Sequence, residues 1–128
     1  MDCFKLNDDG RRKVVAEGLL DVSRVIREGH VDLDHASISC ALALARINKQ
    51  PVDVSELAKI SGVPRATVIR KVKIWHEQGM VEIHRAKGRT YVVPSRAGAT
   101  NENSMWLWSS YERIFRNVAR NLSKLDSE

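Results

Sequence analysis

The chain contains 128 residues, of which 43% are hydrophobic and 29% are charged, and its net charge is +5. These values are typical of one globular domain that buries a hydrophobic core and does not need disulfide bonds or a structural metal for stability. No apolar run approaches the roughly 18 residues of a membrane span. Because MDCFKLNDDGRRKVV at the N-terminus also lacks a signal-peptide pattern, we expect a single cytoplasmic domain over residues 1–128.

Neither the cysteines nor the histidines form a recognised chemical motif. Cys3 and Cys40 make no CxxC pair, and the four histidines lack metal-ligand spacing. There is no glycine-rich phosphate loop, no nucleophile elbow and no pair of carboxylates on a shared face. We therefore expect no enzyme activity, no metal and no cofactor. Within SISCALALA, Cys40 is expected to be a small buried hydrophobe.

The first predicted helix covers residues 9–28. Its apolar residues recur at spacings of three and four, and so share one stripe: Val15, Leu19, Val22 and Ile26. Asp8 or Asp9 can cap the start of this helix, and Gly29 can end it.

The central segment, residues 34–96, opens with a second predicted helix. This helix begins after Asp34, a good N-cap, and ends before the Gln-Pro pair of the sequence. A short helix follows, because Asp53 and Glu56 have the spacing of a capping box. Gly62 ends the short helix, since glycine accepts the left-handed conformation that a tight turn requires.

A further helix and a hairpin complete the central segment. Pro64 fits the first turn of this helix. Its core-facing residues share one side: Val68, Val72 and Trp75. Beyond Gly79 the apolar period changes to two on both sides of Gly88, which predicts a β-hairpin over residues 81–93. Val52 can add a short extended stretch.

The last predicted helix covers residues 104–125. Its apolar stripe is long: Leu107, Tyr111, Ile114, Val118, Leu122 and Leu125. Trp106 and Trp108 stand at its start.

The positive charge is concentrated in one part of the chain. Residues 65–96 hold eight lysines and arginines against two glutamates, a net charge of +6 that leaves the other residues at −1. A localised basic patch indicates a polyanionic partner. The elements predict a mainly α fold with a small β-hairpin, in which a winged helix-turn-helix is flanked by N- and C-terminal helices.

The stretch from residue 54 to residue 98 resembles the DNA-binding core of the MarR family of bacterial transcription regulators. The motifs that carry the resemblance are SELA, GVPRATV, W-x-x-x-G-M-V and VPSRAG. It implies a cytoplasmic homodimer that binds double-stranded DNA at a pseudo-palindromic operator, with residues 9–28 and 104–125 as dimerisation helices. Family members often bind small effectors between the dimer helices and the DNA-binding domain. For Trp106 and Trp108, which are large and apolar, we favour packing in the dimer core over the binding of an unknown effector.

Ten residues are candidates for DNA contact. They occupy the exposed side of the recognition helix and the hairpin, called the wing: Arg65, Ala66, Thr67, Ile69, Arg70, Lys71, Lys73, Arg85, Lys87 and Arg89. Arg65 and Arg70 are expected to read bases, because an arginine can pair bidentately with guanine. Lys71 and Lys73 are expected to contact phosphates.

A second reading is a winged-helix module that binds another protein instead of DNA. The wing lacks the family's usual acidic residue, since Ala86 and Lys87 precede Gly88. Ile69 and Ile74 are apolar residues expected on the exposed side of the recognition helix. Selection of random duplexes followed by a salt titration separates the two readings, because only a DNA-binding protein enriches a motif and responds steeply to salt.

Overall fold

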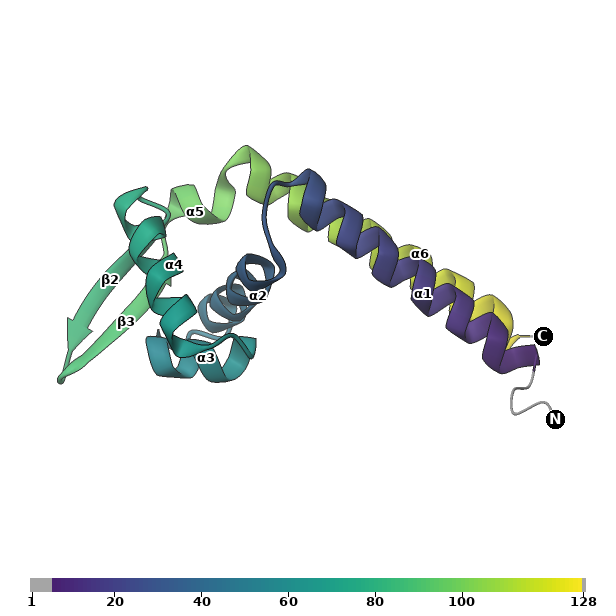
Figure 1. The fold of residues 1–128 in the computed structure, drawn as a ribbon, viewed down its shortest axis with the longest axis horizontal. Helices are drawn as coiled ribbons and strands as arrows, with labels where there is room; N and C mark the ends of the chain where they lie inside the picture. Colours follow the sequence, from purple (N-terminus) through teal and green to yellow (C-terminus); the bar gives the residue numbers. More distant parts are fainter. Residues whose placement is uncertain (1–5, 128) are drawn as a thin grey trace. The chain divides into compact units, whose positions relative to one another are not determined.

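A computed structural model of the chain describes residues 6–127, and Cys3 lies outside them. The fold is mainly helical, with a small three-stranded antiparallel sheet (Figure 1). In chain order the elements are α1 (Leu6–Glu28), α2 (Leu33–Ile47), β1 (Val52–Asp53), α3 (Val54–Ser61), α4 (Arg65–Glu77), β2 (Val81–Ala86), β3 (Arg89–Pro94), α5 (Arg96–Thr100) and α6 (Glu102–Asp126).

The contacts divide the chain into two compact units. Of the described residues, we call 6–30 with 106–127 the helical pair, and 31–105 the central unit. Within residues 6–127, no helix combines the length and the apolar character that crossing a bilayer requires.

In the helical pair, α1 and α6 run antiparallel at close range. Three glycines in and just after α1 meet side chains of α6 in reverse order: Gly10 at Leu125, Gly18 at Val118 and Gly29 at Leu107. A Cβ at Gly18 would lie 2.6 Å from Val118 Cγ2, and one at Gly29 would lie 2.6 Å from Leu107 Cδ2. Because real Cβ contacts are much longer, a side chain at Gly18 or Gly29 would collide with α6 unless Val118 or Leu107 moved.

The structure corrects two predictions for α1 and bears out its end. The helix begins at Leu6, so Asp8 and Asp9 lie inside its first turn and do not precede it as caps. The helix ends at Glu28, directly before Gly29 as expected, and the left-handed residue that follows is His30, with φ 57°. Two members of the predicted stripe, Val15 and Leu19, are exposed, whereas Val22 is partly buried and Ile26 is buried, so only the second half of this stripe is covered.

The predicted stripe of α6 does face α1. Leu107 and Ile114 are buried, together with Ser110 between them. The other four members are partly buried: Tyr111, Val118, Leu122 and Leu125. The apolar spacing of this helix was therefore a correct guide to its packing.

The central unit has its own core, to which α2, α3, α4 and the three strands all contribute. Its fully enclosed side chains are Ile38, Leu57, Val68 and Val92. The N-cap of α2 is Asp32, not the predicted Asp34: its Oδ1 accepts a 2.7 Å hydrogen bond from the backbone N–H of His35. Cys40 is exposed on this helix, so the prediction of a buried cysteine was wrong.

The connection from α3 to α4 follows the prediction closely. The Asp53 carboxylate accepts from the Glu56 backbone N–H at 2.8 Å, and the Glu56 carboxylate accepts from the Asp53 N–H at 3.2 Å. This reciprocal capping box satisfies donors that the first turn of α3 cannot pair. Gly62 ends α3 in the left-handed conformation, with φ 74°, and Pro64 immediately precedes α4.

The sheet has the strand order β1-β3-β2. Val52 of β1 pairs with Val92 of β3, which confirms the expected extended stretch and joins it to the hairpin. At the other end of β3, the turn between β2 and β3 consists of Lys87 and Gly88, with φ 51° and 75°. Two left-handed residues in a two-residue loop are the signature of a type I′ turn, whose twist matches that of the strands.

A short helix, α5, packs on the connection between α4 and β2. The Ser95 hydroxyl donates to the Gly79 carbonyl at 2.6 Å and accepts from the Gly98 N–H at 3.0 Å. A Cβ at Gly98 would lie 2.0 Å from the Met80 carbonyl oxygen. The backbone of α5 therefore lies directly against the backbone that leads into the hairpin.

Candidate functional site

Helix α4 has two chemically different sides. Val68 and Val72 are buried, and Trp75 packs against the same core from a partly buried position. Five of the seven predicted site residues on this helix are exposed: Arg65, Ala66, Ile69, Arg70 and Lys73. Thr67 and Lys71 are intermediate. The amphipathic spacing thus leaves a basic side of α4 open to solvent.

Arg65 is held at the start of α4 by a neighbouring helix. Its Nε donates to the Ser55 hydroxyl of α3 at 3.2 Å. This contact uses one of the five N–H donors of the guanidinium and leaves its two terminal nitrogens free of that bond. The side chain therefore has a defined direction before any partner binds.

Lys71 departs from the prediction of a freely exposed phosphate contact. Its Nζ lies 3.0 Å from Asp32 Oδ2, and its side chain is only 18% exposed. The hydrogen bond from the His35 backbone N–H, and next the one from Lys71, hold the pKa of Asp32 below its usual value. One carboxylate thus caps α2 with one oxygen and binds α4 with the other.

His35 packs beside this ion pair and against the inner side of α4. Its ring lies edge-on to the Trp75 ring, with centroids 4.8 Å apart and planes at 68°. Burial lowers the pKa of His35, the positive charge of Lys71 lowers it further, and Asp32 opposes both effects. Sequence reasoning missed Asp32 and His35, because their partners on α4 lie about 40 residues away in the chain.

The β2–β3 hairpin presents three further basic residues. Arg85, Lys87 and Arg89 are all exposed. Arg85 pairs with Thr90 across the ladder, and Ala86 pairs with Arg89. Because cross-strand partners share a face and successive residues alternate, Arg85 and Arg89 lie on opposite faces of the hairpin, on either side of the turn.

Few acids neutralise these basic side chains. Among the described residues, no aspartate or glutamate forms an ion pair with six of them: Arg65, Arg70, Lys73, Arg85, Lys87 and Arg89. Glu82, the acid on β2, contacts His84 at 3.2 Å. The positive potential of these six side chains is therefore not cancelled by ion pairs within the described chain.

The two tryptophans at the start of α6 belong to the helical pair. Trp106 is 39% exposed and Trp108 is 40% exposed. The Trp108 ring lies edge-on to Tyr111, with centroids 6.0 Å apart. Large apolar groups with this exposure still have surface that another molecule can cover.

No further chemistry or relationship defines the site. Across residues 6–127, no group of three histidines, cysteines or acids is placed to hold a metal ion. Comparisons with protein-family profiles, curated proteins and solved structures found no match.

Proposed function

We propose that this protein is a sequence-specific, double-stranded DNA-binding transcription regulator of the winged helix-turn-helix class, acting as a homodimer. The observation that carries the proposal is the basic surface of α4 and the hairpin, on which six of the seven predicted lysines and arginines form no ion pair with an acid of the described chain and only Lys71 does. The major groove of B-DNA is about 12 Å wide and admits one α-helix. In this assignment α4 is the recognition helix and the β2–β3 hairpin is the wing.

The connection between α3 and α4 supports this assignment. The capping box at Asp53 fixes where α3 begins, and Gly62 supplies the sharp turn after it. Val68 and Val72 then anchor α4 through its buried side. A helix held in this way can present its other side to the groove without losing its own packing.

The basic residues have distinct roles in the proposed complex. Arg65 and Arg70 read base edges, while Lys73 contacts a phosphate. Lys71 contributes only if a phosphate replaces the carboxylate of Asp32. The hairpin arginines, on opposite faces of the turn, suit a minor groove that has a phosphate backbone on each side.

The apolar surface that the helical pair leaves uncovered supports the homodimer. Two helices bury only one side of each other, and six large apolar residues remain more than a third exposed: Val15, Leu19, Leu20, Trp106, Trp108 and Phe115. A second copy that covers these residues places two recognition helices in one complex. The operator is then an imperfect palindrome with half-sites roughly 10 bp apart, or a multiple of that distance.

Selection of random DNA duplexes, followed by a salt titration, tests the proposal. We expect an enriched palindromic motif, and log K should fall by about 0.9 per phosphate contact for each unit of log salt. R70A/K73A should lose binding, whereas R46A/K59A removes the same charge from α2 and α3 and should bind like wild type. An equal loss in both variants would contradict the assignment of α4 as the recognition helix.

A second candidate function is docking to another protein through α4. Ile69 and Ile74 are 41% and 44% exposed on this helix. Exposed apolar groups beside a basic surface also fit an acidic protein partner. If the selection enriches no motif and weak DNA binding is the same for every sequence, this reading replaces the first.

A further inference from the structure

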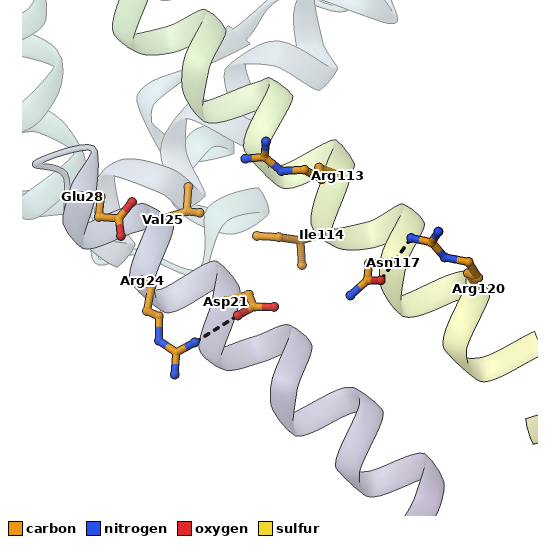
Figure 2. A pocket seen from close by; sticks show the side chains of 8 residues that line it. All are labelled: Asp21, Arg24, Val25, Glu28, Arg113, Ile114, Asn117 and Arg120. Atoms are coloured by element: carbon orange, nitrogen blue, oxygen red, sulfur yellow. Dashed lines mark hydrogen bonds and ion pairs between the residues drawn. The ribbon is translucent and has the colours of Figure 1, made fainter. Parts of the chain in front are cut away.

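A groove between α1 and α6 is lined by three arginines, each of which binds within its own helix through a terminal nitrogen (Figure 2). Arg24 Nη1 lies 3.1 Å from Asp21 Oδ1, and Arg120 Nη2 donates to Asn117 Oδ1 at 3.1 Å. The outer end of a guanidinium is the edge at which its two terminal nitrogens can donate together. The contacts in this groove use part of that edge, so these arginines are poorly placed to offer it to a partner.

Arg65 is bound differently, through its Nε and to another helix. The Nε donates to the Ser55 hydroxyl at 3.2 Å. Within residues 6–127, no hydrogen bond or ion pair uses the terminal nitrogens of Arg65. A guanidinium can pair bidentately through Nε and one terminal nitrogen, or through both terminal nitrogens. The bond to Ser55 occupies the first of these edges and leaves the second available.

The backbone on both sides of this contact is held in place. Ser55 lies in the first turn of α3, between Asp53 and Glu56, the two residues of the capping box. Arg65 begins α4, which buried Val68 anchors one turn later. The fold therefore sets the direction of the guanidinium in the free protein. Less side-chain entropy is then lost when a partner binds.

The start of α4 offers Arg65 no negative charge. The first turn of this helix contains no acid, and Pro64 at the N-cap position makes no side-chain hydrogen bond. The positive end of a helix dipole disfavours a cation, so Arg65 stands at an unfavourable place for the helix itself. An external group with two acceptors would satisfy both terminal nitrogens. Guanine presents such a pair, O6 and N7, in the major groove.

We infer that Ser55 is a positioning residue for base recognition: it holds the Arg65 guanidinium so that both terminal nitrogens donate to O6 and N7 of one guanine. The inference rests on the proposed function and names one base that each half-site contains. Ser55 touches no base in this arrangement. Its hydroxyl acts through Arg65, by fixing which edge of the guanidinium faces the groove.

Fluorescence anisotropy with a selected operator tests this role. For wild type, 7-deazaguanine in place of the contacted guanine removes the N7 acceptor and should weaken binding, and R65A identifies the position because it no longer responds to this change. S55A should bind the operator about threefold to tenfold more weakly and respond less to 7-deazaguanine at that position alone. S55T keeps the hydroxyl and should bind like wild type. S109A, which removes an exposed hydroxyl from α6, is the matched control.

A double-mutant cycle and an NMR measurement separate positioning from direct contact. R65A and S55A/R65A should bind the operator equally, because Ser55 acts only through Arg65. In the free protein, NMR relaxation should show a more ordered Arg65 Nε–H in wild type than in S55A. This second measurement needs no DNA.

The outcomes distinguish this inference from the proposed function. A selection that enriches no motif would overturn both. If a motif is enriched, but S55A weakens binding to every duplex equally or its loss adds in full to that of R65A, Ser55 contacts a phosphate by itself and the positioning role is wrong. Equal mobility of Arg65 Nε–H in wild type and S55A would also overturn the positioning role alone.

Discussion

Asp32 and Lys71 join the first turn of α2 to the middle of α4. Lys71 Nζ lies 3.0 Å from Asp32 Oδ2, while Asp32 Oδ1 accepts the backbone N–H of His35. The lysine side chain is largely covered, but the carboxylate is 63% exposed. An ion pair with one solvated member contributes little by itself, so the capping bond is expected to be the larger of the two contributions of Asp32.

Two substitutions at Asp32 separate its roles. D32A removes both the cap and the ion pair and should lower the free energy of unfolding by about 1–2 kcal/mol. D32N keeps an N-cap acceptor and should cost less than about 1 kcal/mol. D34A, at the residue that the sequence favoured as the cap, is the matched control and should cost least. Urea denaturation at neutral pH measures all three, and a larger loss for D34A than for D32A would contradict the assignment.

The Asp32 carboxylate also makes stability depend on pH in the acid range. Its pKa is lowered in the folded protein, first by the His35 backbone N–H and then by Lys71. The stabilisation is therefore complete above the unfolded pKa of about 4 and is lost as the pH falls through the lower folded value. Urea denaturation below about pH 4.5 should show a steeper loss for wild type than for D32N.

A separate pH dependence is expected from His35 at higher pH. Burial lowers its pKa in the folded protein, so the unfolded chain takes up the proton first as the pH falls below about 6.5. The free energy of unfolding should then decrease with falling pH, by at most about 1.4 kcal/mol per unit. Between about pH 7 and pH 5, the free energy of unfolding of H35Q should change less with pH than that of wild type. Near pH 8, the difference in free energy of unfolding between H35Q and wild type measures the packing on Trp75 that the substitution removes. Identical pH slopes for H35Q and wild type would exclude this role.

Gly98 is the position where a single methyl group should be least tolerated. Its Cβ would lie 2.0 Å from the Met80 carbonyl oxygen, which is backbone and cannot turn aside as a side chain would. G98A should lower the free energy of unfolding by more than about 2 kcal/mol. G62A is the control, because nothing lies within 4 Å of a Cβ at that position. Only the strain of the left-handed backbone should then lower the free energy of unfolding, by about 1 kcal/mol. Thermal or urea unfolding should give a clearly lower free energy of unfolding for G98A than for G62A.

Local chemistry made much of the central unit predictable. The capping box at Asp53, the left-handed turn at Gly62 and the hairpin around Gly88 each depend on residues within a few positions of one another. Such signals are complete within a short stretch of sequence. The basic side of α4 was predictable for the same reason, since helical spacing alone separates it from Val68 and Val72.

The incorrect predictions share a dependence on distant partners. Asp34 has the right chemistry for an N-cap, but Asp32 is the residue that accepts the His35 backbone N–H, and it also binds Lys71, 39 positions away. The Asp32–Lys71 pair spans 39 positions and leaves no local pattern. In α1, the spacing of Val15 and Leu19 suggests an inner face, yet both residues remain exposed in the pair that α1 forms with α6.

The ion pair between Asp32 and Lys71 also leads to a prediction about DNA, which rests on the proposed function. In the free protein the Asp32 carboxylate is bonded to the Lys71 ammonium, which a DNA phosphate would otherwise contact. K71A should therefore weaken DNA binding less than K73A, whose lysine is exposed on the same helix and has no acid to displace. D32N removes the negative charge that binds Lys71 and leaves the lysine in place on α4. The affinity of the D32N protein for DNA should therefore rise. The slope of log K against log salt should steepen by about 0.9, the value for one added phosphate contact. Fluorescence anisotropy with a selected operator at several salt concentrations measures both quantities. If D32N leaves the slope unchanged, Lys71 serves the fold alone and α4 contacts DNA through its other basic residues.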